Sequence, residues 1–201
     1  MPLRRHLACL ATATLLFLAG SAQAIPIVYE FSGTVTQGSL NGIAFANRGF
    51  TVDVFGDTSG VVSGAPVLPP GGLVNTATSV TFSISGVGSG TLLNTYQMFL
   101  VSNAVGFWHL PDQLDRIDVV NGVFAGYALA TAFGPVTTGS NFIVQFLPDP
   151  TTAGPLDMSG GTNVSFRSFF PTARAPEPAS LLLLALGLIG LGFSRRKLVS
   201  A

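Results

Sequence analysis

The sequence has little of the chemistry that most catalytic sites use. Among 201 residues it holds one cysteine, two histidines and 9% charged side chains. The cysteine, Cys9, and the first histidine, His6, both lie near the N-terminus, so that the remainder of the chain contains His109 and no cysteine. That remainder can enter an oxidising compartment and still form no disulfide. It also has neither a cysteine nucleophile nor a pair of histidines.

Positive charge is scarce in the middle of the chain. Residues 25–173 contain no lysine and carry eight acidic against three basic side chains, a net charge of −5. The basic residues are Arg48, Arg116 and Arg167. Binding to nucleic acid or to anionic lipid needs a basic patch, and this composition provides none. We therefore expect no nucleic-acid partner.

The N-terminus has the three parts of a secretory signal peptide. Arg4 and Arg5 are followed by an apolar stretch at residues 7–19, and then by the small residues Ala22 and Ala24. Signal peptidase recognises small residues at these two positions, so cleavage after Ala24 is predicted, leaving Ile25 as the new N-terminus. An uncleaved anchor helix is the alternative.

The C-terminus combines a short motif, an apolar run and a basic cluster. Pro176, Glu177 and Pro178 precede apolar residues 181–193, and the run is followed by the basic cluster Arg195, Arg196 and Lys197. As a helix, residues 179–194 would span roughly 24 Å, against a bilayer core of about 30 Å. The sequence therefore predicts a marginal transmembrane helix, with the basic cluster as its cytoplasmic membrane stop. A buried core helix is the alternative.

These C-terminal residues resemble a PEP-CTERM sorting signal. The resemblance rests on Pro176-Glu177-Pro178, the leucine-rich run and Arg195-Arg196-Lys197, and covers about 26 of the 201 residues. In that family the tail is recognised by exosortase, an integral-membrane cysteine protease or transpeptidase of Gram-negative bacteria, whose substrates are typically encoded beside exopolysaccharide machinery. The resemblance implies transient insertion in the inner membrane and then transfer to the cell surface or extracellular matrix. It makes this chain the substrate of the enzyme, so no catalytic residue carries over.

The segment between the two signals reads as an all-β domain. Apolar residues alternate with polar ones, which is typical of half-buried strands. The inward sets are Ile27, Tyr29, Phe31 and Val35; Phe50, Val52 and Val54; Val80, Phe82 and Ile84; Phe142, Val144 and Phe146; and Val164, Phe166 and Phe170. Turn-forming pairs such as Asn41-Gly42 separate them. We predict eight or nine short strands in an antiparallel β-sandwich or jelly-roll-like body.

These patterns predict four segments in the chain. They are a signal peptide (1–24), the β body (25–170), a proline-rich linker with the sorting motif (171–178) and a transmembrane sorting segment (179–201). Within the body, further strands are predicted at residues 96–101, 104–108, 116–120 and 127–133, and long loops at 60–75 and 148–162.

Trp108, His109 and Asp112 are the candidate ligand-binding residues. An indole can stack on a sugar ring, and a nearby imidazole and carboxylate could bind sugar hydroxyls. The alternative is that Trp108 or Phe107 lies in the core, because neighbours on a strand point to opposite faces, and that Asp112 only forms a turn. Asp115 and Asp118 follow, but calcium requires six to eight oxygen ligands, and no metal site or cofactor is predicted.

The sequence does not predict an enzyme. No serine lies in a Gly-x-Ser-x-Gly motif, and the string at residues 86–90 lacks the spacing of a phosphate loop, so it is expected to link two strands. The predicted function is a structural or adhesive surface protein processed by exosortase. An exopolysaccharide-binding module is the alternative, followed by a secreted hydrolase with a carboxylate pair that the sequence does not specify.

Overall fold

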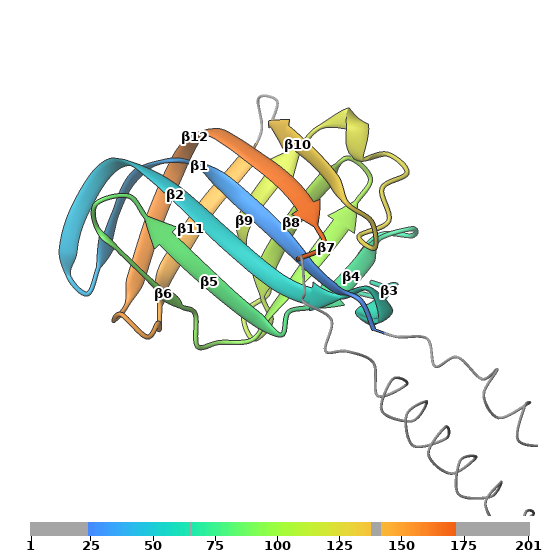
Figure 1. Ribbon diagram of the computed structural model, residues 1–201, viewed down its shortest axis with the longest axis horizontal. Coiled ribbons are helices and arrows are strands. Elements are labelled where there is room, and N and C mark those ends of the chain that lie inside the picture. The colour runs from blue at the N-terminus through green and yellow to red at the C-terminus, as the bar shows by residue number, and fades with distance from the viewer. Residues whose placement is uncertain (1–23, 65, 138–141, 172–201) are drawn as a thin grey trace, which may run out of the picture. The chain divides into compact units, whose positions relative to one another are not determined.

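The computed structural model describes residues 24–64, 66–137 and 142–171 (Figure 1). The chain divides into two compact units, Met1–Pro171 and Thr172–Ala201, and all described residues belong to the first. The predicted linker lies outside the described residues except for Pro171. Most of the signal peptide and all of the sorting segment lie outside them too. Among the described residues, no helix has the length and hydropathy needed to cross a bilayer.

Strands dominate the described part of the chain. Three of them are long: β1 (Pro26–Leu40), β2 (Ile43–Asp57) and β12 (Leu156–Phe169). The shorter ones are β3 (Val61–Ser63), β4 (Leu73–Thr76), β5 (Ser79–Ile84), β6 (Gly88–Thr91), β7 (Tyr96–Val101), β8 (Ala104–His109), β9 (Leu114–Val120), β10 (Phe133–Thr137) and β11 (Phe142–Asp149). Two single-turn 3-10 helices, η1 (Thr58–Gly60) and η2 (Gly122–Phe124), complete the body. The predicted all-β class is confirmed, but the described residues form twelve strands rather than the eight or nine short ones expected.

Every strand pairing in the body is antiparallel, and the pairings form one continuous sheet. The order is β3-β4-β7-β8-β9-β11-β12-β1-β2-β5-β6, with β10 paired to β12 beside this path. β11 joins the two arms of the sheet, because it pairs with β9 on one side and β12 on the other. The arms enclose a common core, where Phe31 of β1 and Phe107 of β8 meet with ring centroids 5.5 Å apart.

The alternation seen in the sequence correctly predicts which side chains fill this core. The described inward residues of β1, β2 and β5 are all buried, and so are Val164 and Phe166 of β12. Phe170 is the exception, since it lies beyond the end of β12 and is 42% exposed. Burial of alternate apolar side chains on both arms supplies most of the driving force for folding.

Three local predictions are wrong. Of the strand predicted at 127–133, Phe133 alone lies in a strand, as the first residue of β10, because Gly126 and Leu129 adopt left-handed φ angles of 89° and 56° that interrupt an extended chain. The predicted loop at 60–75 contains β3 and β4, which pair with each other. The predicted loop at 148–162 contains the end of β11 and the start of β12, which form a hairpin.

Both ends of the body lie at the same end of the sheet. β1 and β12 are neighbours, with Val28 opposite Phe169 near the chain ends and Leu40 opposite Leu156 at the far end. A strand of 15 residues is roughly 46 Å long at about 3.3 Å per residue. The β1–β2 hairpin tip is therefore at the opposite end from the points where the chain enters and leaves the body.

Candidate functional site

The candidate residues Trp108, His109 and Asp112 lie at the end of β8 and in the turn to β9. The structure brings His109 and Asp112 together, with 2.8 Å between Nδ1 and Oδ2. Asp112 Oδ1 also accepts a hydrogen bond from the Leu114 backbone N–H at 2.9 Å, which closes the turn. Trp108 takes no part in this contact. Its side chain lies on the opposite face of β8 from Phe107, which packs in the main core.

Trp108 presents no open ring face for a sugar. It is only 6% exposed and stacks on Phe99 of β7, with ring centroids 5.0 Å apart and an interplanar angle of 18°. Val74 completes this second apolar cluster, and Leu68 packs against it from the β3–β4 connection. This cluster thus holds the β3–β4 connection against the sheet.

Arg116 organises the acidic residues around the turn. Its Nη2 donates to Asp112 Oδ2 at 3.0 Å, and its Nε donates to Asp149 Oδ2 at 2.7 Å. Slight burial opposes ionisation of Asp112, but the His109 contact, the Leu114 N–H and the Arg116 guanidinium outweigh it and lower the pKa of Asp112 to about 2. The carboxylates of Asp112 and Asp149 therefore already accept hydrogen bonds, from Arg116 in both cases and also from the Leu114 backbone in the case of Asp112. Within the described ranges, no group of three or more His, Cys, Asp or Glu side chains could hold a metal ion.

Asp115 and Asp118 form a second acidic pair, which strand spacing alone does not predict. The β8–β9 register shifts between Phe107 and Trp108, so that Asp115 lies opposite Trp108 and Asp118 lies opposite Gly106. This bulge brings two side chains three residues apart onto one face. Burial, together with the charge and hydrogen bond of Asp115, raises the pKa of Asp118 to about 8. Protonation of Asp118 therefore removes the repulsion between the two carboxylates.

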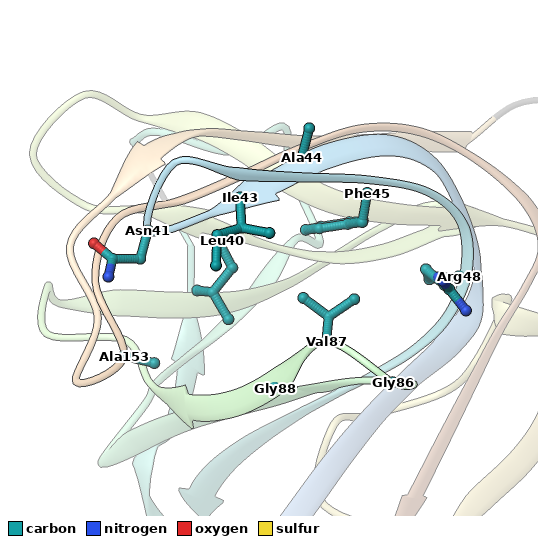
Figure 2. A pocket seen from close by; sticks show the side chains of 10 residues that line it. All are labelled: Leu40, Asn41, Ile43, Ala44, Phe45, Arg48, Gly86, Val87, Gly88 and Ala153. Carbon is teal, nitrogen blue, oxygen red and sulfur yellow. The ribbon is translucent and has the colours of Figure 1, made fainter.

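Sequence reasoning missed a cavity of about 510 Å³ at the β1–β2 hairpin tip (Figure 2). Its lining comes from three separate connections, so no local motif could reveal it. The weak signals are the exposed Ile43 after the Asn41-Gly42 turn and Arg48, one of only three arginines in the body.

The C-terminal region matches a family model. The model is described as the PEP-CTERM protein-sorting motif, and the match covers residues 174–197. It includes Pro176, Glu177 and Pro178 and the basic cluster, which all lie outside the described residues. No curated protein and no solved structure matches the chain. The sorting motif is thus identified, while the comparisons leave the β body without a relative.

Proposed function

We propose that this chain, which carries a PEP-CTERM sorting motif, is an exported surface or extracellular-matrix protein of a Gram-negative bacterium that exosortase cleaves near Pro176-Glu177-Pro178. The single observation that carries the proposal is the family match over residues 174–197. The motif marks the chain as an exosortase-targeted surface protein. Signal peptidase would first remove residues 1–24, and the apolar run with its basic membrane stop would then hold the chain in the inner membrane during sorting.

The geometry of the body supports removal of both ends. Ala24 is exposed and precedes the first residue of β1, Pro26, by two positions. Ile25 already participates in the fold, because its carbonyl accepts a hydrogen bond from Thr58 N–H at 3.0 Å. At the other end, β12 finishes at Phe169, before the matched motif begins. Cleavage at either signal would therefore leave every strand intact.

We propose a structural or adhesive role for the body, with no catalytic activity. The body would be a sandwich- or jelly-roll-like unit with one core between two sheet arms. Sugar stacking on Trp108 is disfavoured by the burial of its ring. Asp112 and Asp149 are paired with Arg116, so these two carboxylates are not free to act as a catalytic acid and base. Binding to exopolysaccharide is the second candidate function. It would have to use a surface that does not include Trp108.

Intact mass of the exported protein tests the sorting proposal. In cells with exosortase, the expected product starts at Ile25 and lacks the apolar run and basic cluster. In cells without exosortase, the C-terminus should extend to Ala201 and the protein should stay with the inner membrane. Glu177→Ala should resemble the exosortase-free case, while Asp157→Ala, a matched acid in the body, should be processed normally. A C-terminus at Ala201 in both strains would refute processing.

A further inference from the structure

The cavity at the β1–β2 hairpin tip is lined by apolar side chains, by polar backbone atoms and by one cationic side chain. Leu40, Ile43, Phe45 and Val87 converge on it, and Arg48 lies at one end, as Figure 2 shows. A volume of about 510 Å³ falls in the usual range for small-molecule sites. Neither the sorting motif nor the proposed structural role requires such a cavity.

The backbone keeps this cavity open. β5 pairs with β2 only from Phe50 to Phe55, so the part of β2 nearest the tip pairs with β1 alone. The β5–β6 turn then passes beneath the tip through Gly86, whose φ of 70° favours glycine. Gly88 follows, and a Cβ there would lie 3.0 Å from Leu40 Cδ2. Val87, between the two glycines, therefore supplies the one side chain of this floor.

Arg48 differs from the other two arginines of the body. Arg116 is paired with Asp112 and Asp149, and Arg167 is paired with Glu30. No carboxylate among the described residues pairs with Arg48. Its Nη1 would lie 3.7 Å from a Cβ at Gly86, which places the guanidinium beside the cavity floor. The body has a net charge of −5, so Arg48 does not belong to a basic surface. It is a single cation beside the cavity, without an acidic partner among the described residues.

The walls determine which anion would fit. Leu40 and Phe45 are largely buried, but Ile43 is 70% exposed, so apolar surface is left beside the cavity. Burying that surface would be favourable by about 25 cal/mol per Å². The polar side chains in the lining are Arg48 and Asn41. A phosphate dianion would need a second cation, and Arg48 is the one cationic side chain in the lining.

We propose that this cavity binds an amphipathic carboxylate. The guanidinium of Arg48 holds the carboxylate by two parallel hydrogen bonds, which is the geometry that arginine favours. The alkyl chain lies against Leu40, Phe45 and Val87 and covers Ile43. Because Leu40 and Phe169 lie at opposite ends of the β1–β12 pair, the site is at the opposite end of the body from Phe169, where β12 ends.

Octanoate is a suitable probe, tested on the full chain in non-ionic detergent. Backbone amide shifts of Val87 and Gly88 report the cavity itself and are insensitive to octanoate that dissolves in micelles. We expect saturable shifts with octanoate, and weaker shifts with octanol and with octylammonium. Arg48→Gln should weaken octanoate binding roughly tenfold or more, because a charge-assisted contact is lost, and Arg48→Lys should restore part of it.

Matched variants separate this site from general effects. Arg167→Gln removes an exposed cation elsewhere and should leave the octanoate affinity unchanged. Ile43→Ser removes an exposed apolar side chain and should weaken binding severalfold without affecting the fold.

Equal affinity for octanol and octanoate, or no effect of Arg48→Gln, would overturn the carboxylate assignment. Shifts with glucuronate but not octanoate would overturn the amphipathic class, and no shifts at millimolar octanoate would overturn the site. Each outcome is independent of exosortase processing.

Discussion

Arg116 and Asp149 form a two-point ion pair inside the protein. Nε of Arg116 lies 2.7 Å from Oδ2 of Asp149, and Nη2 lies 3.2 Å from Oδ1. Their side chains are 2% and 4% exposed. Since Arg116 is on β9 and Asp149 ends β11, the pair ties together strands next to the point where the two arms of the sheet meet. Nη1 donates to the Leu114 carbonyl, so the buried guanidinium is well satisfied.

Removing one partner of this pair should be costly. Asp149→Asn keeps the shape of the side chain but leaves the charge of Arg116 buried with only the partly exposed Asp112 as counter-ion. Loss of one partner of a buried pair typically costs about 3–5 kcal/mol. We expect the free energy of unfolding, measured by urea denaturation, to fall by about 3 kcal/mol.

Glu30→Gln is the control for the ion-pair prediction. It breaks the Arg167–Glu30 pair, in which the Arg167 side chain is 49% exposed. Surface pairs contribute about 0–1 kcal/mol, because water screens them. Equal losses for the two variants would show that the Arg116–Asp149 pair has no special role.

The raised pKa of Asp118 predicts a pH-dependent stability. The Asp118 carboxyl group of the folded protein retains its proton up to about pH 8, whereas in the unfolded chain it has the ordinary aspartate pKa of 3.8. The unfolded state therefore binds fewer protons between these values, and stability should decrease as pH rises from about 4 to about 8. Above that range, this contribution should become constant.

Urea midpoints at about pH 5 and about pH 9 would measure this dependence. Asp118→Asn, which cannot ionise, should lose less stability between the two pH values than the unsubstituted protein. Asp157→Asn changes an acid at the start of β12 and should retain the full decrease. The pH prediction is wrong if Asp118→Asn and the unsubstituted protein show the same difference.

The parts of the fold that local pattern determines were predictable. The alternation in β1, β2 and β5 places one side of each strand in the core, and Asn41-Gly42 forms the expected hairpin turn, with φ angles of 51° and 80°. Such features depend only on neighbouring residues in the sequence. The sorting motif was predictable for the same reason, since its parts are contiguous.

The features that depend on distant partners were not predictable. The bulge opposite Trp108 changes which side chains of β9 share a face, and it arises from pairing with β8 rather than from the sequence of β9 alone. Arg116 and Asp149 are 33 residues apart, and nothing local identifies them as partners. Trp108 is buried in a cluster with Phe99 and Val74, and Leu68 packs against this cluster from a connection that the sequence presented only as a loop.

Gly106 should tolerate no side chain. A Cβ at this position would overlap Asp118 Oδ1 and the Ile117 carbonyl oxygen, and would lie 2.7 Å from Phe99 Cζ. Because the carbonyl oxygen belongs to the neighbouring strand, the clash cannot be relieved by a rotamer change. Gly106→Ala should lower the free energy of unfolding by about 1–3 kcal/mol.

Gly122→Ala is the matched control for this substitution. A Cβ on Gly122 would meet no atom within 4 Å, and its φ is not left-handed. Thermal melts of the two variants should therefore differ clearly, with Gly122→Ala close to the unsubstituted protein. A Gly106→Ala melt as high as that of Gly122→Ala would show that β8 and β9 can separate locally without loss.

Trp108 is the single tryptophan of the chain and should report the packing of the outer apolar cluster. Its burial against Phe99 predicts blue-shifted fluorescence and weak quenching by acrylamide in the folded state, with both properties lost on unfolding. Phe99→Ala removes the stacked ring and should increase quenching severalfold while costing about 3 kcal/mol. Phe170→Ala, which removes an exposed ring, should leave the fluorescence unchanged. Strong quenching in the unsubstituted protein would mean that the indole is open to solvent, which would make Trp108 available to a sugar after all.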